Sequence, residues 1–430
     1  MPGNLLTRID VRGAGADLRA ILAHRADEDE RVADVAREIV EAVRTGGDAA
    51  LRANAAEFDG AEIHDLGVDR FEWEAALERL EPPLRAALEF ARDQILAWHE
   101  AQREKEARHE RSGIHVRELV VPVDRAGCYV PGGVAPLASS LLMTAIPARV
   151  AGVSEVVVCS PSRADGSVDD AILAAAVLAD VDELYRAGGA GAIAAMAYGT
   201  ETIRPVDVIV GPGSAYTSAA KRLVAPVVGI DGFAGPSEVA IVCDASVDPA
   251  LVAADLLAQA EHGPGGSVTV ITWDDDVAER VDLALDALLS VAARRDFAAQ
   301  TLAAGGRVVL VEDPGRALDV SNAIAPEHLE LMCADADLLV PLVRQAGAVF
   351  VGADAPAVIG DYVAGVNHVL PTAGTARFAS ALRVADFQKH VHVVSLDGDA
   401  LRRVAPFVRA LAEHEGLSAH ADAIRLREER

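Results

Sequence analysis

The chain has 430 residues, a length that predicts two or more domains. Hydrophobic residues make up 51% of it and aromatic residues only 4%, so its cores must be built from Ala, Val and Leu. The net charge of −27 argues against nucleic acid or an anionic membrane as a partner, because both repel an acidic surface. We find no membrane-spanning apolar run and no signal peptide, and we expect a soluble, cytoplasmic protein.

The first quarter of the chain is predicted to be largely helical. After a short lead-in over residues 1–25, hydrophobic residues recur with helical spacing over 30–44, and the glycines at 46–47 close this helix. A second helical region covers 71–108 and is broken at the prolines of 82–83. Its charged outer face predicts a solvated surface.

From Val116 onward, short β-type runs alternate with Ala-rich helical stretches, which predicts parallel βαβ units in doubly wound sheets. The first series has strands at 155–159, 183–186 and 206–210 and helices at 170–179, 190–198 and 217–224. The second has strands at 238–243, 268–272, 307–311 and 348–351 and helices at 249–262, 276–291 and 335–346. Two such series predict two similar α/β domains, followed from about residue 382 by a charged helical segment.

The four cysteines form no CxxC pair, and three of them lie in or beside apolar runs. We therefore expect small core residues rather than metal ligands or disulfides. These cysteines are Cys128, Cys159, Cys243 and Cys333.

Gln259 and His262 lie three residues apart at the end of a predicted helix, which Gly263 stops. An amide oxygen and an imidazole on one helix face could bind a cation if a carboxylate and another imidazole came from elsewhere. A single pair of this kind is more often an exposed helix end that binds nothing.

Loops that follow strands are where α/β proteins usually place function, and two of them here are rich in glycine. One carries Tyr129. The other contains Gly189-x-Gly191-x-x-Ala194, a literal dinucleotide fingerprint, with Asp207 as a possible ribose acid. The abundance of Ala and Gly, and the place of Asp207 within a later strand, favour coincidence.

Two further loops and the C-terminal segment carry titratable side chains. Glu327 and His328 are adjacent, which gives two proton-transfer groups with different intrinsic pKa values. An adjacent Glu and His are usually an ordinary surface pair. The other candidates are Asp361, His368, Glu415 and His420.

Eleven of the twelve histidines fall into three groups. Four lie beside a glycine, an acid or a turn, where a site would be built: His262, His328, His368 and His420. Two alternate in an apolar, strand-like run and are expected to tune packing: His390 and His392. Five lie in charged surroundings and are expected to be solvated surface residues: His24, His64, His99, His109 and His115. Spacing in the sequence leaves open whether the four histidines of the first group lie close together in the fold.

Together these motifs resemble one family, the histidinol dehydrogenases. The resemblance runs in order over almost the whole chain. It is carried by GGDAALRANAAEFDG (46–60), AWHEAQ (97–102), GCYVPGG (127–133), YRAGGAGAIAAMAYGTE (185–201), GPGSAY (211–216), AGPSEV (234–239), DLLAQAEHGP (255–264), APEHLEL (325–331), GDYVAGVNHVLPT (360–372), ADFQKH (385–390) and EGLSAH (415–420).

The resemblance implies an enzyme with one zinc ion per subunit that uses NAD to oxidise L-histidinol, through L-histidinaldehyde, to L-histidine, the last step of histidine biosynthesis. His328 would accept the alcohol proton as hydride leaves for NAD, and Glu327 would activate the water that attacks the aldehyde. By position, the metal ligands, which also hold the substrate, would be Gln259, His262, Asp361 and His420. The other substrate contacts would be Ser237, His328, His368 and Glu415.

The resemblance also implies the fold: two doubly wound, Rossmann-like (incomplete) parallel-sheet domains with small N- and C-terminal helical segments, in an intertwined homodimer. Glu415 and His420 would then act on the partner's site. The expected parts are an N-terminal extension (1–25), a metal and catalytic domain (26–128 with 237–381), a nucleotide-side domain (129–236) and a C-terminal helical segment that reaches the partner (382–430).

Two positions depart from the family pattern, and both belong to the expected NAD contacts. The family has Gln where this chain has Gly191 and Asn where it has Ser214, whereas Tyr129 is kept. Each lost amide removes a hydrogen bond worth about 0.5–1.5 kcal/mol. The expected consequence is weaker NAD binding, another nicotinamide cofactor, or contacts filled by water.

Three other functions are compatible with the residues. The first is a related enzyme that oxidises another small primary alcohol to its acid; the intact substrate-side residues argue against it, and the departures at Gly191 and Ser214 keep it open. The second is a zinc-dependent hydrolase that uses metal-bound water. The third is a catalytically silent metal-binding protein.

Overall fold

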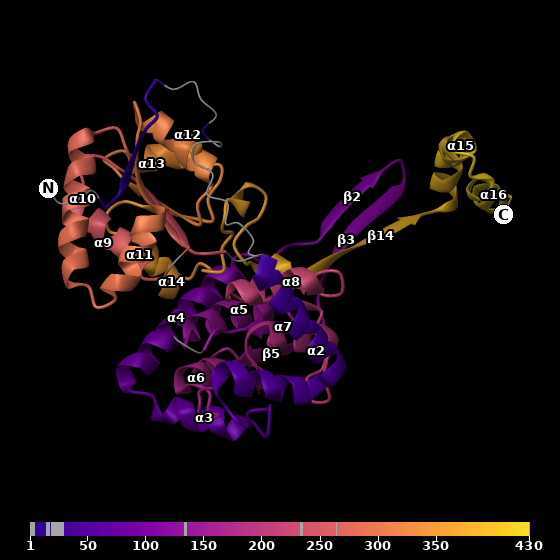
Figure 1. Ribbon diagram of the computed structural model, residues 1–430. Coiled ribbons are helices and arrows are strands. Elements are labelled where there is room, and N and C mark those ends of the chain that lie inside the picture. The colour runs from indigo at the N-terminus through magenta and orange to yellow at the C-terminus, as the bar shows by residue number, and fades with distance from the viewer. Residues whose placement is uncertain are drawn as a thin grey trace.

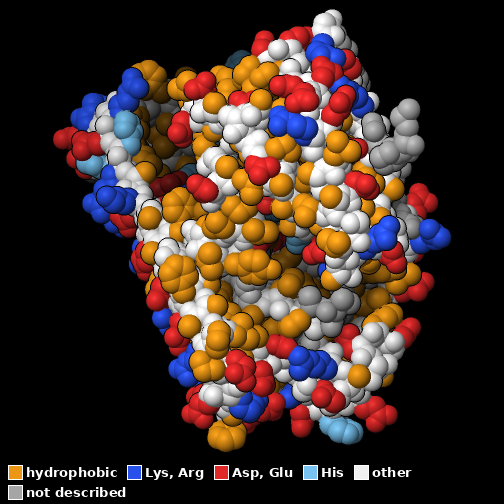
Figure 2. Space-filling view, turned by 90° about the vertical axis from the view of Figure 1, so that its left-hand side faces the viewer, with side chains coloured by type: hydrophobic (Ala, Val, Ile, Leu, Met, Phe, Trp, Pro, Cys, Tyr) orange, Lys and Arg blue, Asp and Glu red, His pale blue; other side chains and the backbone are white. Residues whose placement is uncertain are grey.

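The molecule consists of two α/β lobes and an arm that projects away from them (Figure 1). The computed structural model describes residues 5–13, 18, 30–132, 136–232, 235–263 and 265–429. Hydrophobic side chains gather across the middle of the face shown in Figure 2, with acidic and basic side chains spread around them.

The upper lobe in Figure 1 is built on a six-stranded parallel sheet. Its strands, in spatial order, are β1 (Thr7–Asp10), β11 (Gly306–Leu310), β10 (Ser267–Thr272), β9 (Glu238–Cys243), β12 (His328–Met332) and β13 (Ala348–Val351). Successive residues of β9 point to opposite faces, so Val239 packs on one side and Ala240 on the other. Because both faces are covered, these strands are continuous apolar runs.

Helices cover both faces of this sheet. One face packs against α9 (Pro249–Ala260), α10 (Asp275–Val291) and α11 (Arg295–Gly305). The opposite face packs against α12 (Pro314–Ile324) and α13 (Ala336–Leu339). The carboxylates of Asp248, Asp274 and Asp313 accept backbone N–H groups and cap the first turns of α9, α10 and α12. The short helix α14 (Ala357–Tyr362) follows β13.

The lower lobe contains a five-stranded parallel sheet. Its strands, in spatial order, are β6 (Glu183–Arg186), β5 (Glu155–Ser160), β4 (Arg125–Tyr129), β7 (Val208–Val210) and β8 (Gly229–Ile230). One face packs against α3 (Arg70–Arg79), α4 (Pro82–Glu100), α5 (Ala138–Ala151) and α6 (Asp170–Leu178). The other packs against α2 (Glu30–Asn54), α7 (Gly189–Tyr198) and α8 (Ala215–Val224). A short π-helical turn, Ala55–Asp59, follows α2.

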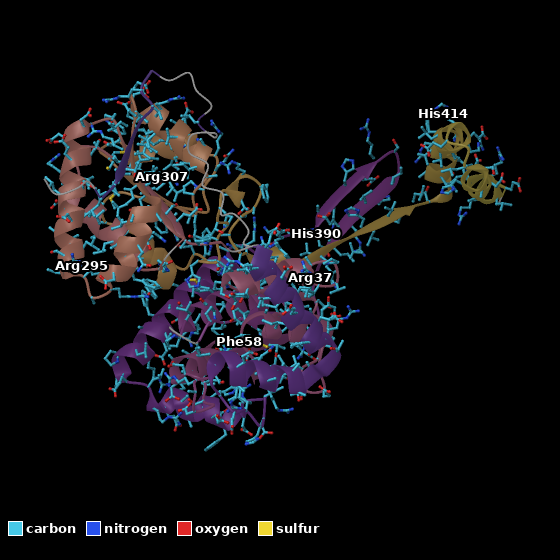
Figure 3. The ribbon with its side chains drawn as sticks, viewed as in Figure 1. Arg37, Phe58, Arg295, Arg307, His390 and His414 are labelled. Carbon is cyan, nitrogen blue, oxygen red and sulfur yellow. The ribbon has the colours of Figure 1, made fainter. Side chains whose placement is uncertain are left out.

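The arm is a three-stranded antiparallel sheet that ends in two helices (Figure 1). Its strands, in spatial order, are β14 (Gln388–Leu396), β3 (Ile114–Pro122) and β2 (Ala107–Arg111). The helices are α15 (Gly398–His414) and α16 (Ser418–Glu428). Figure 3 places His390 at the base of the arm and His414 at its tip.

The predicted fold class, with two doubly wound parallel sheets, is confirmed; the dimer stays a prediction. Four predicted helical regions differ from the structure. The region predicted over 71–108 ends at Glu100, and residues 107–111 form strand β2. The segment predicted to be helical from about residue 382 contains strand β14 ahead of its two helices. The helix predicted over 30–44 continues to Asn54 across a non-helical residue, Gly47 (φ 54°, ψ −136°). The helix predicted over 335–346 is only α13, followed by a 3₁₀ turn, Val340–Leu342. Further 3₁₀ turns cover Thr375–Arg377 and Val384–Phe387.

The domain boundaries also stay a prediction, but the packing bears on them. Strand β1 lies in the segment predicted as an N-terminal extension, and it is an edge strand of the six-stranded sheet. Helices α2, α3 and α4 pack on the five-stranded sheet, which favours placing residues 30–100 with the nucleotide-side unit.

The predictions for cysteine and histidine can be compared directly with the fold. All four cysteines are free and buried, as predicted. The prediction for His99 is wrong: its ring is fully buried in α4, with Nδ1 2.8 Å from the carbonyl oxygen of Ile95, and burial lowers its pKa. His64, His109 and His115 are exposed, and His24 lies outside the described residues. No helix in the described part of the chain is long and apolar enough to cross a membrane.

Candidate active site

Glu327 and His328 lie where β12 begins, beside the first residues of β9. The expectation that they follow the carboxyl end of a strand is therefore wrong. Their edge of the six-stranded sheet is its amino edge, where the helix-end residues Gln259 and His262 also precede a strand, β10. Tyr129, by contrast, ends β4 at the carboxyl edge of the other sheet.

The Glu327 carboxylate is held by two donors at this edge. Its Oε2 accepts a hydrogen bond from Ser237 Oγ (2.5 Å) and another from the Glu238 backbone N–H (2.8 Å). Burial raises the pKa of Glu327, while the hydrogen bonds from Ser237 and Glu238, and the charge of His328 when its ring is protonated, oppose that rise. The result is a fixed, buried carboxyl group that holds a proton more strongly than a surface glutamate.

The His328 ring is buried beside this carboxylate, and its hydrogen bond fixes its tautomer. Nδ1 lies 3.1 Å from the carbonyl oxygen of Glu238, which can only accept, so Nδ1 carries the proton. In the neutral ring Nε2 then carries the lone pair, and it lies 3.8 Å from Oδ1 of Asp361. A neutral imidazole with an unprotonated Nε2 is suited to accept a proton.

His368 connects the two lobes. Its Nδ1 lies 3.0 Å from the carbonyl oxygen of Asp361, so Nδ1 donates, and Nε2 accepts from Ser140 Oγ of α5 (2.8 Å). Burial lowers the pKa of His368. The neighbouring Asn367 donates to the carbonyl oxygen of Met143 in the same helix.

Three of the four predicted metal ligands line one small cavity: Gln259, His262 and Asp361. The amide nitrogen of Gln259 is buried there, and no described residue is its hydrogen-bond partner. An amide oxygen, an imidazole and a carboxylate form a donor set that suits zinc. Among the described residues, however, no group of three or more His, Cys, Asp or Glu side chains is arranged to hold a metal ion.

The structure does not bring Glu415 and His420 to this cavity. Glu415 caps the end of α15, and His420 lies in the first turn of α16; both are exposed on the arm, away from the lobes (Figure 1). Within one chain, three of the four predicted ligands therefore lie at one cavity, and the fourth, His420, does not.

The predicted nucleotide-side residues lie in the other lobe. The Tyr129 hydroxyl accepts from the Gly189 backbone N–H (3.0 Å), just ahead of Gly191 in the first turn of α7. Ser214 caps α8, and its Oγ accepts from the Thr217 backbone N–H (3.4 Å). All of them lie at the carboxyl edge of the five-stranded sheet.

Comparison with known proteins decides the family. A sequence model for histidinol dehydrogenase matches residues 22–428. The chain belongs to the histidinol dehydrogenase family. It is 47% identical to the histidinol dehydrogenase of Rhizobium meliloti (strain 1021) over 414 residues, which are 96% of this chain and 95% of that protein. It is 44% identical to the enzyme of Methanothermobacter thermautotrophicus, over 94% of this chain and 95% of that protein.

The fold agrees with this assignment. The crystal structure of histidinol dehydrogenase from Elizabethkingia anophelis superposes with a TM-score of 0.95 at 32% identity, covering 100% of this chain and 99% of that chain. Membership of the histidinol dehydrogenases confirms the predicted enzyme class, an oxidoreductase of histidine biosynthesis. The metal, the coenzyme and the role of each residue stay predictions.

The cavity is also lined by two carboxyl groups that no sequence motif singled out, those of Asp255 and Glu330. Both line the cavity of Gln259 and His262, and burial raises the pKa of each. Glu330 Oε1 accepts from the Ala357 backbone N–H (2.7 Å) at the start of α14. Spacing could have found them, since Glu330 is two strand residues from His328 and Asp255 is one helical turn before Gln259.

Proposed function

We propose that the chain catalyses the NAD-dependent, four-electron oxidation of L-histidinol through L-histidinaldehyde to L-histidine. The observation that carries this proposal is the buried pair of Glu327 and His328, beside the cavity lined by Gln259, His262 and Asp361. A double oxidation needs one group to take a proton from an alcohol and another to take one from water. This pair offers a neutral imidazole and a carboxylate, held by separate hydrogen bonds.

His328 accepts the alcohol proton at Nε2, because Nδ1 is committed to the carbonyl oxygen of Glu238. Glu327 takes a proton from the water that attacks the aldehyde, and Ser237 keeps its carboxylate in place. His368, held between Asp361 and Ser140, orients the substrate where the two lobes meet. The NAD contacts are Tyr129, Gly191 and Ser214.

One zinc ion per subunit, when bound, would anchor the imidazole-bearing substrate and polarise its oxygen. Gln259, His262 and Asp361 would hold it from one chain. The fourth ligand, His420, and the substrate contact Glu415 would come from a second copy in a cytoplasmic homodimer. The exposed apolar side chains of α15, Phe407, Val408 and Leu411, support such pairing, because they leave the arm with an uncovered apolar surface.

The test is the stoichiometry of NADH formation by the purified, zinc-loaded protein. With L-histidinol, about two NADH are expected for each L-histidine formed, since each hydride transfer moves two electrons. Treatment with a chelator should abolish this activity, and added zinc should restore it. If neither NAD nor NADP supports histidine formation by the loaded protein, the proposal is wrong, and a screen of other small primary alcohols follows.

A further inference from the structure

We propose that Asn54, at the end of α2, supplies the side-chain amide that is missing at Gly191 and donates a hydrogen bond to the nicotinamide coenzyme. The inference rests on the proposed function, since it takes the coenzyme to bind beside Tyr129 and the first turn of α7. No motif assigns this role to Asn54.

Asn54 occupies the volume that a side chain at position 191 would need. A Cβ atom built on Gly191 would lie 2.6 Å from Asn54 Nδ2 and 3.4 Å from a methyl group of Leu51. The first of these distances is shorter than real Cβ contacts, so the Asn54 amide would have to move to admit a side chain at position 191. The Asn54 amide therefore occupies the place that a longer residue at position 191 would take.

The amide nitrogen of Asn54 is an unused donor. Nδ2 is buried, and no hydrogen-bond partner lies near it within the described part of the chain. A buried donor without an acceptor is costly, so such groups are usually paired. Because Nδ2 has no exposed surface, a small rotation of the Asn54 side chain would bring it to a hydroxyl, carboxamide or phosphate oxygen of a bound dinucleotide, which would supply the missing acceptor.

The second half of α2, which ends at Asn54, is fastened to the segment that follows α7. Gly47 interrupts the helix, and any side chain there would overlap with the Glu201 carboxylate. Beyond the interruption, the Asp48 backbone N–H donates to Glu201 Oε2 (2.7 Å), and Asp48 accepts from the Thr202 hydroxyl (2.5 Å). Glu201 and Thr202 follow α7, so these contacts fix the last turns of α2 against that helix.

Other polar groups gather at the same end of α7. The Tyr129 hydroxyl bonds the backbone N–H of Gly189, two residues before Gly191. A Cβ atom on Gly188 would lie 3.3 Å from an oxygen of Asp59, which ends the π-helical turn after Asn54. Figure 3 places Phe58 of this turn in the lower lobe, away from the arm. Asn54 is therefore part of the polar lining around an expected coenzyme contact.

The direct test is equilibrium binding of NAD to zinc-loaded protein, measured by isothermal titration calorimetry. The Asn54→Ala variant should raise the NAD dissociation constant about 5- to 10-fold, the loss expected for one hydrogen bond. The dissociation constant of L-histidinol should not change. Glu57→Ala, an exposed truncation on the same turn, is the matched control and should leave both constants unaltered.

A second substitution distinguishes a coenzyme contact from a packing effect. Gly191→Gln alone should weaken NAD binding, because the new side chain meets the Asn54 amide. In the double variant Asn54→Ala with Gly191→Gln, the glutamine gains room to donate from α7, and the affinity should recover at least severalfold relative to Asn54→Ala.

The inference fails if folded Asn54→Ala protein binds NAD as tightly as the unaltered chain, or if the double variant binds no better than Asn54→Ala. Both outcomes leave the proposed function intact. Failure of the unaltered, zinc-loaded chain to bind NAD or NADP would overturn the proposed function as well.

Discussion

Glu327 and His328 are adjacent in sequence, but their surroundings give them different properties. Burial raises the pKa of the Glu327 carboxyl, so its ionised form is a stronger base than an exposed glutamate. The proton on Nδ1 of His328 is fixed by the Glu238 carbonyl oxygen, which leaves Nε2 to act. Two bases in one site can therefore accept protons from two different donors, an alcohol and a water molecule, in succession.

Replacing these two residues should separate the two oxidations. Glu327→Gln should slow the oxidation of L-histidinaldehyde about 10²- to 10⁴-fold and slow alcohol oxidation less, whereas His328→Asn should mainly slow alcohol oxidation. NADH formation is measured with each substrate separately. In the unaltered enzyme, aldehyde oxidation should fall as the pH drops through the raised pKa of Glu327, since the protonated carboxyl cannot accept a proton.

Glu279→Gln, on the exposed side of α10, is the control for loss of a carboxylate and should keep both rates. Equal losses in both steps for the two active-site variants would contradict the division of labour.

The candidate residues could be named from the sequence, but their arrangement in space could not. Adjacent Glu327 and His328, and the helix-end pair of Gln259 and His262, are local patterns. The contact between His368 and Ser140 joins residues 228 positions apart, and no periodicity reports such a distance in the chain. Only the family resemblance predicted that these candidate residues belong to one site; their spacing in the sequence did not.

At the scale of elements, the amino edge of the five-stranded sheet is held together by one arginine. Arg125 of β4 is buried and pairs with Glu155 of β5 and Glu183 of β6, and Arg204 joins both carboxylates. Burial by itself would raise the pKa of Glu183, but hydrogen bonds from Arg125, Tyr185 and Arg204 lower it to about 2.

Glu183→Gln should therefore lower the free energy of unfolding at pH 7, by about 1–3 kcal/mol, since it leaves Arg125 partly uncompensated. The folded-state pKa lies below the ordinary value of 4.5, so the stabilisation is complete above pH 4.5 and is lost as the pH falls toward about 2. The free energy of unfolding of both proteins is measured by denaturant unfolding at several pH values.

The difference in the free energy of unfolding between the unaltered chain and Glu183→Gln should thus shrink as the pH falls from about 4.5 to about 2. Glu78→Gln, an exposed substitution on α3, should change stability little at any pH. A pH-independent difference for Glu183→Gln would show that lost packing, not charge, is responsible.

The elements that the sequence left unpredicted share physical causes. Nearly all of α5 is buried, so it has no polar face and no helical periodicity to detect. Strand β2 is exposed along its whole length, so its sequence lacks the alternation of apolar and polar residues that marks a half-buried strand. Seven strands of the two parallel sheets, apolar and bounded by loops, were predicted to within about two residues, whereas β1, β4, β8 and β12 were not predicted.

At the scale of the whole molecule, the arm separates Glu415 and His420 from the site that they are proposed to complete. Two inactive variants should therefore complement each other in a mixed dimer. A mixed dimer of a His420→Ala chain and a Glu327→Ala chain contains one site with a full set of residues. Equal mixing should restore about a quarter of the normal activity, because half of the dimers are mixed and each has one working site.

The measurement is NADH formation after the two chains are refolded together, with mixed dimers confirmed by differently tagged copies. Two chains that both carry His420→Ala serve as the control and should stay inactive. If confirmed mixed dimers show no recovery, sharing of the site between subunits is excluded.

The length of the arm has a further consequence. Strand β14 pairs with β3 at nine positions, from Gln388 opposite Pro122 to Leu396 opposite Ile114. At about 3.4 Å per residue, this ladder spans about 30 Å, and hydrogen-bonded strands cannot stretch. The ladder is thus a spacer of fixed length, and removing two residues from each strand would draw the terminal helices about 7 Å inward while every remaining side chain kept its face.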